Sequence, residues 1–193
     1  MKNYFILCGA NRTPYHFWYP WLFQKLKEET DNVYCPALPK MEFINYKNWS
    51  KIIKAYLKIG AINKDTIFVC HSTACVFLAR FICKNKLNIK GIIFVAGFNT
   101  LNINNEDEEL KKEVIEVNKS FFAQEKQINK LDKFCKNIYA FISDNDPMIE
   151  TKDLKEFADI TKAKPITIKD GGHFNDGRFK TFIKLLERIN SIK

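Results

Sequence analysis

The sequence predicts an α/β protein with three layers, in which a mostly parallel sheet of about six strands carries helices on both faces. Short apolar runs alternate with longer amphipathic segments along the chain, which is the pattern of strands alternating with helices. Several runs are apolar at every position, as in parallel strands that are covered on both faces. The 193 residues, 46% of them hydrophobic, suffice for one core. We therefore expect a single domain over residues 1–193 with no large cap domain.

Each expected strand is a short run rich in apolar, β-branched or aromatic side chains. Pro36 and Pro39 close the second run, because proline cannot donate a hydrogen bond to a neighbouring strand. In chain order the expected strands are Tyr4–Cys8, Val33–Ala37, Thr66–Cys70, Gly91–Ala96, Ile138–Ile142 and Pro165–Ile168.

Each expected helix repeats apolar residues at steps of three and four. An asparagine-rich loop at Asn99–Asn105 precedes the fourth helix, and Glu106–Glu109 places acidic side chains in its first turn, where the helix dipole favours them. The apolar stripe of this helix is Leu110, Val114, Val117 and Phe121. The other expected helices are Trp18–Glu29, Tyr46–Ile59, Thr73–Lys84, Gln124–Phe134, Lys152–Thr161 and Arg178–Ile192.

The net charge of +9 first suggests a nucleic-acid or membrane-surface protein. Residues 1–96 contain 14 basic and 5 acidic side chains, whereas residues 97–193 contain 17 of each. Part of the excess is a row at steps of four, three and four, which predicts one solvated helix face: Lys47, Lys51, Lys54 and Lys58. A patch for acidic partners or anionic lipid is the alternative. Because the chain has only four arginines, which grip phosphate in bidentate fashion, no nucleic-acid partner is expected.

The six cysteines, at positions 8, 35, 70, 75, 83 and 135, include no CxxC pair and no Cys/His metal spacing. We expect reduced thiols in a cytoplasmic protein, with no metal and no cofactor. The apolar run near the N-terminus is too short for a signal peptide, and no run is long enough to span a bilayer. Membrane insertion is therefore not expected.

In a parallel sheet the functional loops follow the carboxyl ends of the strands. Cys70–Ala74, with the sequence C-H-S-T-A, follows the third expected strand and is a relaxed form of the G-x-S-x-G nucleophile elbow. A lone serine at a helix start is more often a cap. Here Asp146 follows the fifth strand and His173 the sixth, which completes the order Ser, Asp, His of a hydrolase triad.

The expected roles follow from the chemistry of the three side chains. Ser72 is the nucleophile, His173 takes and returns its proton, and Asp146 orients the imidazole. Among the other acids, Asp144 is expected to bond its own backbone in a turn, and Asp170 is too close to His173 along the chain to orient it easily.

The oxyanion hole is expected from the backbone N–H groups of Thr73 and Ala10, with Asn11 as the second choice for the latter. Asn11, His16 and Trp18 are candidates for the substrate pocket, the alternative being a helix start that packs on the core. His71 is interpreted as a packing or supporting residue. Arg12 is interpreted as an exposed loop arginine, with contact to a substrate carboxylate as the alternative.

These motifs make the chain similar to the small serine hydrolases of the retinoblastoma-binding protein 9 type, which include bacterial members. The matching residues are Trp18–Leu22, the H-S-T-A elbow, Ser143-x-x-Asp146-Pro147 and Gly171–Phe174, with Phe121-Phe122 at an aromatic position of that family. Cys70 stands where the elbow has its first glycine, and the first loop is shorter. The resemblance implies an α/β-hydrolase fold, a triad of Ser72, Asp146 and His173, and hydrolysis of small esters or amides. The L-x-C-x-E retinoblastoma-binding motif is absent from the sequence.

The leading functional hypothesis is a carboxylesterase-like serine hydrolase that acts on a small acyl substrate through an acyl-enzyme. The alternative is a catalytically weak or silent protein of the same fold that binds a partner. A nucleic-acid or membrane-surface binder ranks last, because lysines dominate over arginines and no RNP-type aromatic motif is present. The sequence does not specify an oligomeric state.

Overall fold

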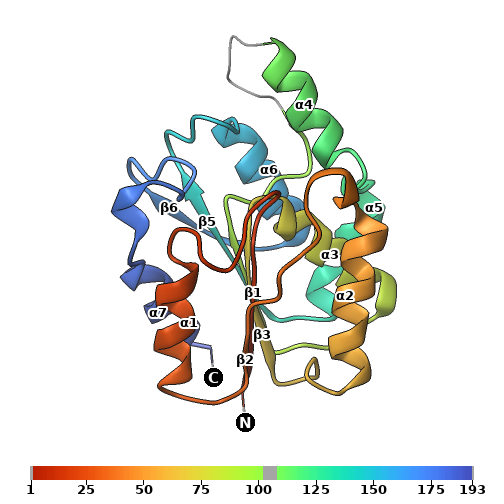
Figure 1. Ribbon diagram of the computed structural model, residues 1–193, viewed down its shortest axis with the longest axis vertical. Coiled ribbons are helices and arrows are strands. Elements are labelled where there is room, and N and C mark those ends of the chain that lie inside the picture. Colours follow the sequence, from red (N-terminus) through yellow and green to blue (C-terminus); the bar gives the residue numbers. More distant parts are fainter. Residues whose placement is uncertain (1, 102–107, 193) are drawn as a thin grey trace.

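The computed structural model describes residues 2–101 and 108–192. Its sheet has six strands, all parallel, in the order β2-β1-β3-β4-β5-β6 (Figure 1). All six predicted strands are confirmed, and so is the α/β class. The strands are β1 Asn3–Leu7, β2 Val33–Tyr34, β3 Thr66–His71, β4 Gly91–Val95, β5 Asn137–Ser143 and β6 Lys164–Ile168.

Strand β2 is shorter than the run Val33–Ala37 predicts. It lies at the edge of the sheet and pairs with β1 at only two positions. Pro36, which has no N–H to donate, follows soon after its end and prevents further pairing on that side.

Helices cover both faces of the sheet, so the three-layer arrangement is confirmed. In Figure 1 the helices α1 and α7 lie on one side of the sheet, and α2, α3 and α5 lie on the other. The described helices are α1 Tyr19–Lys27, α2 Tyr46–Lys58, α3 Thr73–Asn85, α4 Glu108–Asn118, α5 Glu125–Ile128, α6 Thr151–Thr161 and α7 Ile183–Asn190. In the described part of the chain, the segment between β4 and β5 adds short helices and no cap.

Two long helices predicted from the sequence are each divided in the structure. Gln124–Phe134 forms α5 and a short 3₁₀ helix at Leu131–Lys133, because Asn129 ends α5 and the chain turns there. Arg178–Ile192 forms a 3₁₀ helix at Gly177–Phe179 and then α7. The break falls at Phe182, which leaves helical geometry (φ −132°, ψ 72°) and stacks on Phe174 with ring centroids 5.5 Å apart. Burial of an aromatic ring thus outweighs helix continuity at this position.

The start of the fourth predicted helix at Glu106 and most of the loop Asn99–Asn105 lie outside the described residues. Within the described part, α4 begins at Glu108 and ends at Asn118. Phe121 lies beyond its end, where it is buried against Trp49 with ring centroids 4.6 Å apart. Its place in the apolar pattern therefore reflects burial and not helical spacing.

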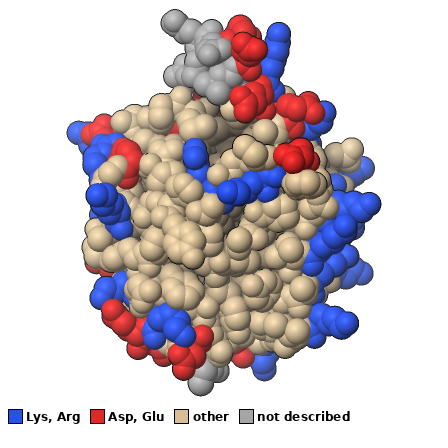
Figure 2. Space-filling view, viewed as in Figure 1, with Lys and Arg blue, Asp and Glu red and all other residues tan. Residues whose placement is uncertain are grey.

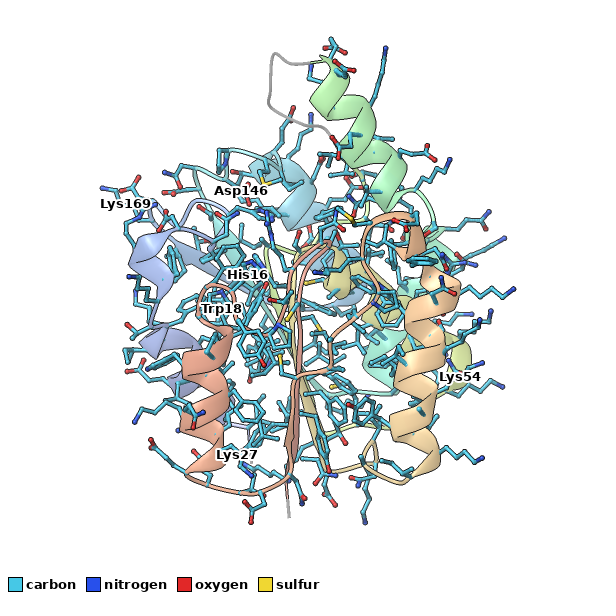
Figure 3. All side chains as sticks on the ribbon, viewed as in Figure 1. His16, Trp18, Lys27, Lys54, Asp146 and Lys169 are labelled. Carbon is cyan, nitrogen blue, oxygen red and sulfur yellow. The ribbon has the colours of Figure 1, made fainter. Side chains whose placement is uncertain are left out.

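The lysine row lies on the solvent side of α2, as predicted. Trp49 and Ile53 of this helix are buried, whereas the four lysines are exposed. Figure 2 shows basic side chains along the edge of the molecule where α2 lies, and Figure 3 shows Lys54 pointing away from the body of the protein. Within the described residues, no helix has the length and apolar character needed to cross a membrane.

All six cysteines are free thiols, as predicted. Five have a pKa raised by burial or by neighbouring thiols, and that of Cys83 lies near 11 because of burial and the nearby Asp132. These thiols are protonated at neutral pH and act as small apolar side chains. The cytoplasmic location stays a prediction.

Candidate active site

Ser72 occupies a sharp turn between the end of β3 and the start of α3. Its backbone has φ 57° and ψ −129°, a conformation that residues with a Cβ rarely adopt. The Ser72 N–H donates to the carbonyl of Val95 (2.9 Å), and the Ser72 carbonyl accepts from the N–H of Cys75 (2.9 Å). The turn is therefore held from both sides, and it has the strand–turn–helix context of a nucleophile elbow.

Two neighbours adapt to this turn. A Cβ on Gly9 would lie 3.1 Å from the Cβ of Ser72 and 3.3 Å from the carbonyl oxygen of His71, so glycine lets the first loop approach closely. Cys70 is fully buried in β3, and its carbonyl accepts from the thiol of Cys75 (3.3 Å). The thiol at the first position of the elbow therefore belongs to the core, and the turn forms without a glycine there.

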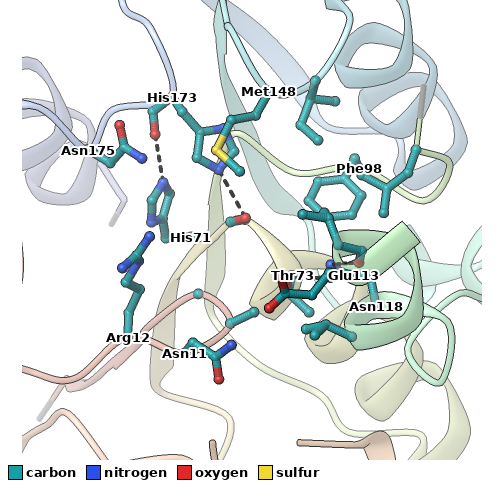
Figure 4. A pocket seen from close by; sticks show the side chains of 17 residues that line it. Asn11, Arg12, His71, Thr73, Phe98, Glu113, Asn118, Met148, His173 and Asn175 are labelled. Carbon is teal, nitrogen blue, oxygen red and sulfur yellow. Dashed lines mark hydrogen bonds between the residues drawn. The ribbon is translucent and has the colours of Figure 1, made fainter. Parts of the chain in front are cut away.

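The structure brings Ser72, His173 and Asp146 together at the carboxyl edge of the sheet. The Ser72 Oγ lies 3.0 Å from His173 Nε2, a hydrogen bond drawn as a dashed line at His173 in Figure 4, and His173 Nδ1 lies 2.7 Å from Asp146 Oδ2. The Asp146 side chain has no exposed surface, and that of His173 is 4% exposed. The arrangement suits a hydroxyl that donates to the imidazole and an imidazole N–H that donates to the carboxylate.

Backbone N–H groups fix the Asp146 carboxylate. Its Oδ1 accepts from Met148 (2.8 Å) and from Ile149 (3.0 Å), which leaves Oδ2 to face the imidazole. Pro147 has no N–H, so both donors come from the residues just beyond it. Each carboxylate oxygen thus has a defined partner, and the side chain has one orientation.

The expectation that Asp144 bonds its own backbone is wrong. Its Oδ1 accepts from the N–H of Asp170 (2.7 Å), and the side-chain carbonyl of Asn145 accepts from the N–H of Gly172 (2.8 Å). Parallel packing of β5 and β6 places these two loops side by side, and the short side chains reach across. Asp144 and Asn145 thus hold the loop that carries His173, whereas Asp146 contacts the imidazole ring of His173.

A buried polar chain connects His173 to the first loop. His71 donates from Nε2 to the carbonyl of His173 (2.9 Å), and its Nδ1 accepts from the hydroxyl of Tyr19 (2.6 Å). The Tyr19 oxygen accepts in turn from the N–H of Gly9 (3.4 Å). Burial, together with the nearby His173, lowers the pKa of His71 to about 3, so the ring is neutral and keeps one tautomer. The sequence suggested support by His71, but the part of Tyr19 was missed.

A cavity of about 160 Å³ opens at Ser72 and His173. Asn11 lines it, as predicted. The sequence did not reveal its apolar wall, which comes from three separate segments: Phe98, Leu101, Val114, Val117, Met148 and Ile149. The apolar stripe with Val114 and Val117 could have indicated this wall, because the apolar face of an amphipathic helix after the fourth strand must pack against another part of the protein.

The expectation that Trp18 and His16 wall the pocket is wrong, because neither side chain lines it. Trp18 is fully buried and donates from Nε1 to the carbonyl of Phe174 (3.1 Å). His16 folds back onto its own turn, where Nδ1 accepts from the N–H of Thr13 (3.0 Å). The alternative, a helix start that packs on the core, describes Trp18 correctly.

Ala10 and Thr73 both line the cavity together with Ser72. Among the described residues, neither N–H donates to another protein group. The Thr73 hydroxyl donates to the side-chain carbonyl of Asn118 (2.5 Å), whose amide donates to the carbonyl of Val114 (2.8 Å). Helix α4 is thereby tied to the residue that follows Ser72. No group of three or more His, Cys, Asp or Glu side chains in the described ranges is arranged to hold a metal ion.

The parallel sheet, the turn at Ser72 and the hydrogen-bonded serine, histidine and aspartate define a protein of the α/β-hydrolase fold. Comparison with known families agrees. A profile of the Serine hydrolase family matches residues 4–185, and the chain belongs to that family.

Individual relatives are distant but cover nearly the whole chain. The serine hydrolase RBBP9 of Rattus norvegicus is 24% identical over 183 residues, which cover 94% of this chain and 90% of the rat protein. The crystal structure of the ydeN gene product from B. subtilis has a TM-score of 0.81 at 20% identity and covers 100% of this chain and 98% of its own. The esterase RhEst1 from Rhodococcus sp. ECU1013 has a TM-score of 0.66 at 11% identity, with coverage of 100% and 92%. The resemblance to the retinoblastoma-binding protein 9 type is confirmed.

Proposed function

We propose that this protein is a carboxylesterase-like hydrolase that cleaves small esters, and by the same chemistry small amides, through an acyl-enzyme on Ser72. The observation that carries the proposal is the continuous chain from Ser72 Oγ through His173 to Asp146 Oδ2, with donor–acceptor distances of 3.0 and 2.7 Å at the cavity. These distances lie within the range in which a base can take a proton from a nucleophile.

In the acylation step the Oγ of Ser72 forms a bond to the substrate carbonyl carbon while His173 Nε2 accepts the hydroxyl proton. The carbonyl oxygen becomes an oxyanion, which the N–H groups of Ala10 and Thr73 stabilise. Collapse of this intermediate breaks the bond to the leaving group, which receives the proton from His173. Asp146 stabilises the imidazolium throughout and keeps its own charge.

Deacylation repeats these steps with water. His173 removes a proton from a water molecule, whose oxygen attacks the acyl carbon, and the proton then returns to Ser72 Oγ as the acid departs. Most of the expected rate enhancement comes from two effects: the positioning of the reacting groups and the stabilisation of the oxyanion by two N–H donors.

The size of the cavity supports a small substrate. Its volume of about 160 Å³ is below the roughly 300–1,000 Å³ of pockets that hold drug-sized ligands. The apolar wall suits a short acyl chain. The structurally similar RhEst1 from Rhodococcus is an esterase, which supports an ester as the bond cleaved.

Turnover of short p-nitrophenyl esters tests the proposal. We expect the wild type to hydrolyse acetyl to hexanoyl esters, and Ser72→Ala and His173→Ala each to reduce kcat by at least about 10³-fold. Circular dichroism of each variant shows whether the fold is kept. If a folded wild type gives no more turnover than folded Ser72→Ala across the series, the protein is not a hydrolase of this class, and a silent partner-binding role takes its place.

A further inference from the structure

The cavity at Ser72 has two chemically different sides (Figure 4). Phe98 lies on one side, near Thr73, and belongs to the apolar wall, and Met148 of the same wall lies beside His173. Arg12 and Asn175 lie on the other side, next to His71. A substrate that spans Ser72 therefore meets Phe98 on one side and the hydrogen-bond donors of Arg12 and Asn175 on the other.

Arg12 supplies the positive charge on the polar side. Its N–H donates to the carbonyl of Gly9 (3.1 Å), and its guanidinium lies 5.4 Å from the centre of the Phe17 ring, a distance at which a cation and an aromatic face attract. The side chain points toward His71 in Figure 4, and its charge contributes to lowering the pKa of that ring. The backbone of Arg12 is thus held by its own loop, and its exposed guanidinium lies near Phe17 at the cavity.

The cationic side chain of Arg12 has no acidic partner within the described part of the chain. Arg12 forms no ion pair there, although several lysines and Arg178 do. Glu113, the acidic side chain among the described residues that line the cavity, comes from α4 and lies with Thr73 and Asn118 on the opposite side (Figure 4). The two sides therefore differ in charge as well as in polarity.

The position of His173 decides which half of the substrate faces Arg12. The leaving group must lie near the imidazole to receive its proton. His71, which Arg12 approaches, contacts the backbone of His173, and Asn175 follows His173 by two residues. On this connection we assign the leaving group to the side of Arg12 and the acyl chain to the side of Phe98 and Glu113.

We propose that Arg12 binds an anionic group on the leaving group, so that the substrates are esters of short apolar acids with alcohols that carry a carboxylate or phosphate. The planar guanidinium matches both oxyanions in bidentate fashion. Glu113 disfavours the same charge on the acyl part. This inference rests on the proposed function and adds the substrate class.

Three matched butanoate esters test the proposed role of Arg12. The first is the ester of 3-hydroxybenzoate. The second is the ester of 3-hydroxybenzamide, which has nearly the same shape and no charge, and the third carries a phosphate in place of the carboxylate. We expect Arg12→Gln to lower the ratio of kcat/KM for anionic over neutral ester about tenfold or more, which is the scale of one charge-assisted hydrogen bond. The same ratio for Arg12→Lys should lie between the ratios for the wild type and for Arg12→Gln. Lys47→Gln, which removes a charge on the solvated face of α2, should leave the ratio unchanged. The oxyanion with the larger Arg12-dependent ratio identifies the preferred group.

A binding measurement keeps the inference separate from the proposed function. Titration calorimetry of the 3-hydroxybenzoate ester with Ser72→Ala should give a lower Kd than the same titration with Ser72→Ala/Arg12→Gln. Equal Kd values, or Ser72-dependent turnover whose anionic-to-neutral ratio does not change in Arg12→Gln, would overturn the role of Arg12 while the hydrolase stands. A hemisuccinate ester of 3-hydroxybenzamide, with its charge on the acyl side, should gain nothing from Arg12. A gain there contradicts the assignment of the two sides.

Discussion

His71 Nε2 donates to the backbone carbonyl of His173 across 2.9 Å, so the residue before Ser72 supports the ring that faces Ser72. Removing this donor should leave the His173 loop less well placed. We predict that His71→Leu lowers kcat about tenfold or more, since a displacement of about 1 Å can cost roughly 10²-fold. His71→Gln, which keeps a donor, should recover part of the loss. A His71→Leu protein that folds and turns over like the wild type would show that the contact does not position His173.

Protonation of the same histidine should make stability depend on pH. The folded pKa of His71 is about 3, below its ordinary 6.5, so between these values the unfolded chain binds a proton that the folded chain does not. The stability from neutral His71 is complete above about pH 6.5 and is lost as the pH falls toward 3. From pH 7 to pH 5 the wild type should lose about 2 kcal/mol more unfolding free energy than His71→Gln.

Urea denaturation of the two proteins at both pH values measures this difference. The variant differs from the wild type only at position 71, so the difference between the two losses reports on His71. An equal loss in wild type and variant would mean that His71 takes up its proton in the folded state without cost.

Two aspartates in one loop provide a matched pair. Asp146→Asn should lower kcat by about 10⁴-fold, because the amide cannot fix the imidazole tautomer as a carboxylate does. Asp144→Asn keeps an acceptor for the N–H of Asp170 and should lower kcat less than about tenfold. Steady-state kinetics with a p-nitrophenyl ester separates the two. Comparable losses in both variants would remove the distinction that the geometry draws between them.

Gly9 should tolerate a methyl group poorly. In Gly9→Ala the new Cβ would meet the Ser72 Cβ at 3.1 Å, so the first loop must move away from the elbow and shift the Ala10 N–H with it. We predict a stability loss of about 1–3 kcal/mol together with a lower kcat. Gly177→Ala is the control, since a Cβ there meets nothing within 4 Å. Thermal unfolding and kinetics of the pair check the prediction, and equal behaviour of the two variants would count against the close approach.

Local patterns in the sequence predict much of this fold. The six strands and the three loops with Ser72, Asp146 and His173 follow from apolar runs and from the rule that functional loops follow parallel strands. The errors depend on distant partners. Trp18 is buried in the core, where it donates to the carbonyl of Phe174, 156 residues away, and Asp144 accepts from the N–H of Asp170. No local pattern carries such contacts.

The missed parts of the site have the same cause. The support of His173 by His71 spans 102 residues, and the apolar wall of the cavity is assembled from segments that follow different strands. The expected helix over Gln124–Phe134 is divided because its residues pack as two turns against the core. Periodicity identifies which residues are buried, and tertiary contacts decide where the helix stops.

The most direct test of the central claim is reaction of the folded protein with a fluorophosphonate, followed by mass spectrometry of the labelled peptide. Phosphonylation requires a serine that a neighbouring base has activated. We predict one equivalent of adduct on Ser72 in the wild type, none in Ser72→Ala, and strongly slowed labelling in His173→Ala. Absence of adduct on Ser72 in folded wild-type protein, or equal labelling of wild type and Ser72→Ala, would contradict the account.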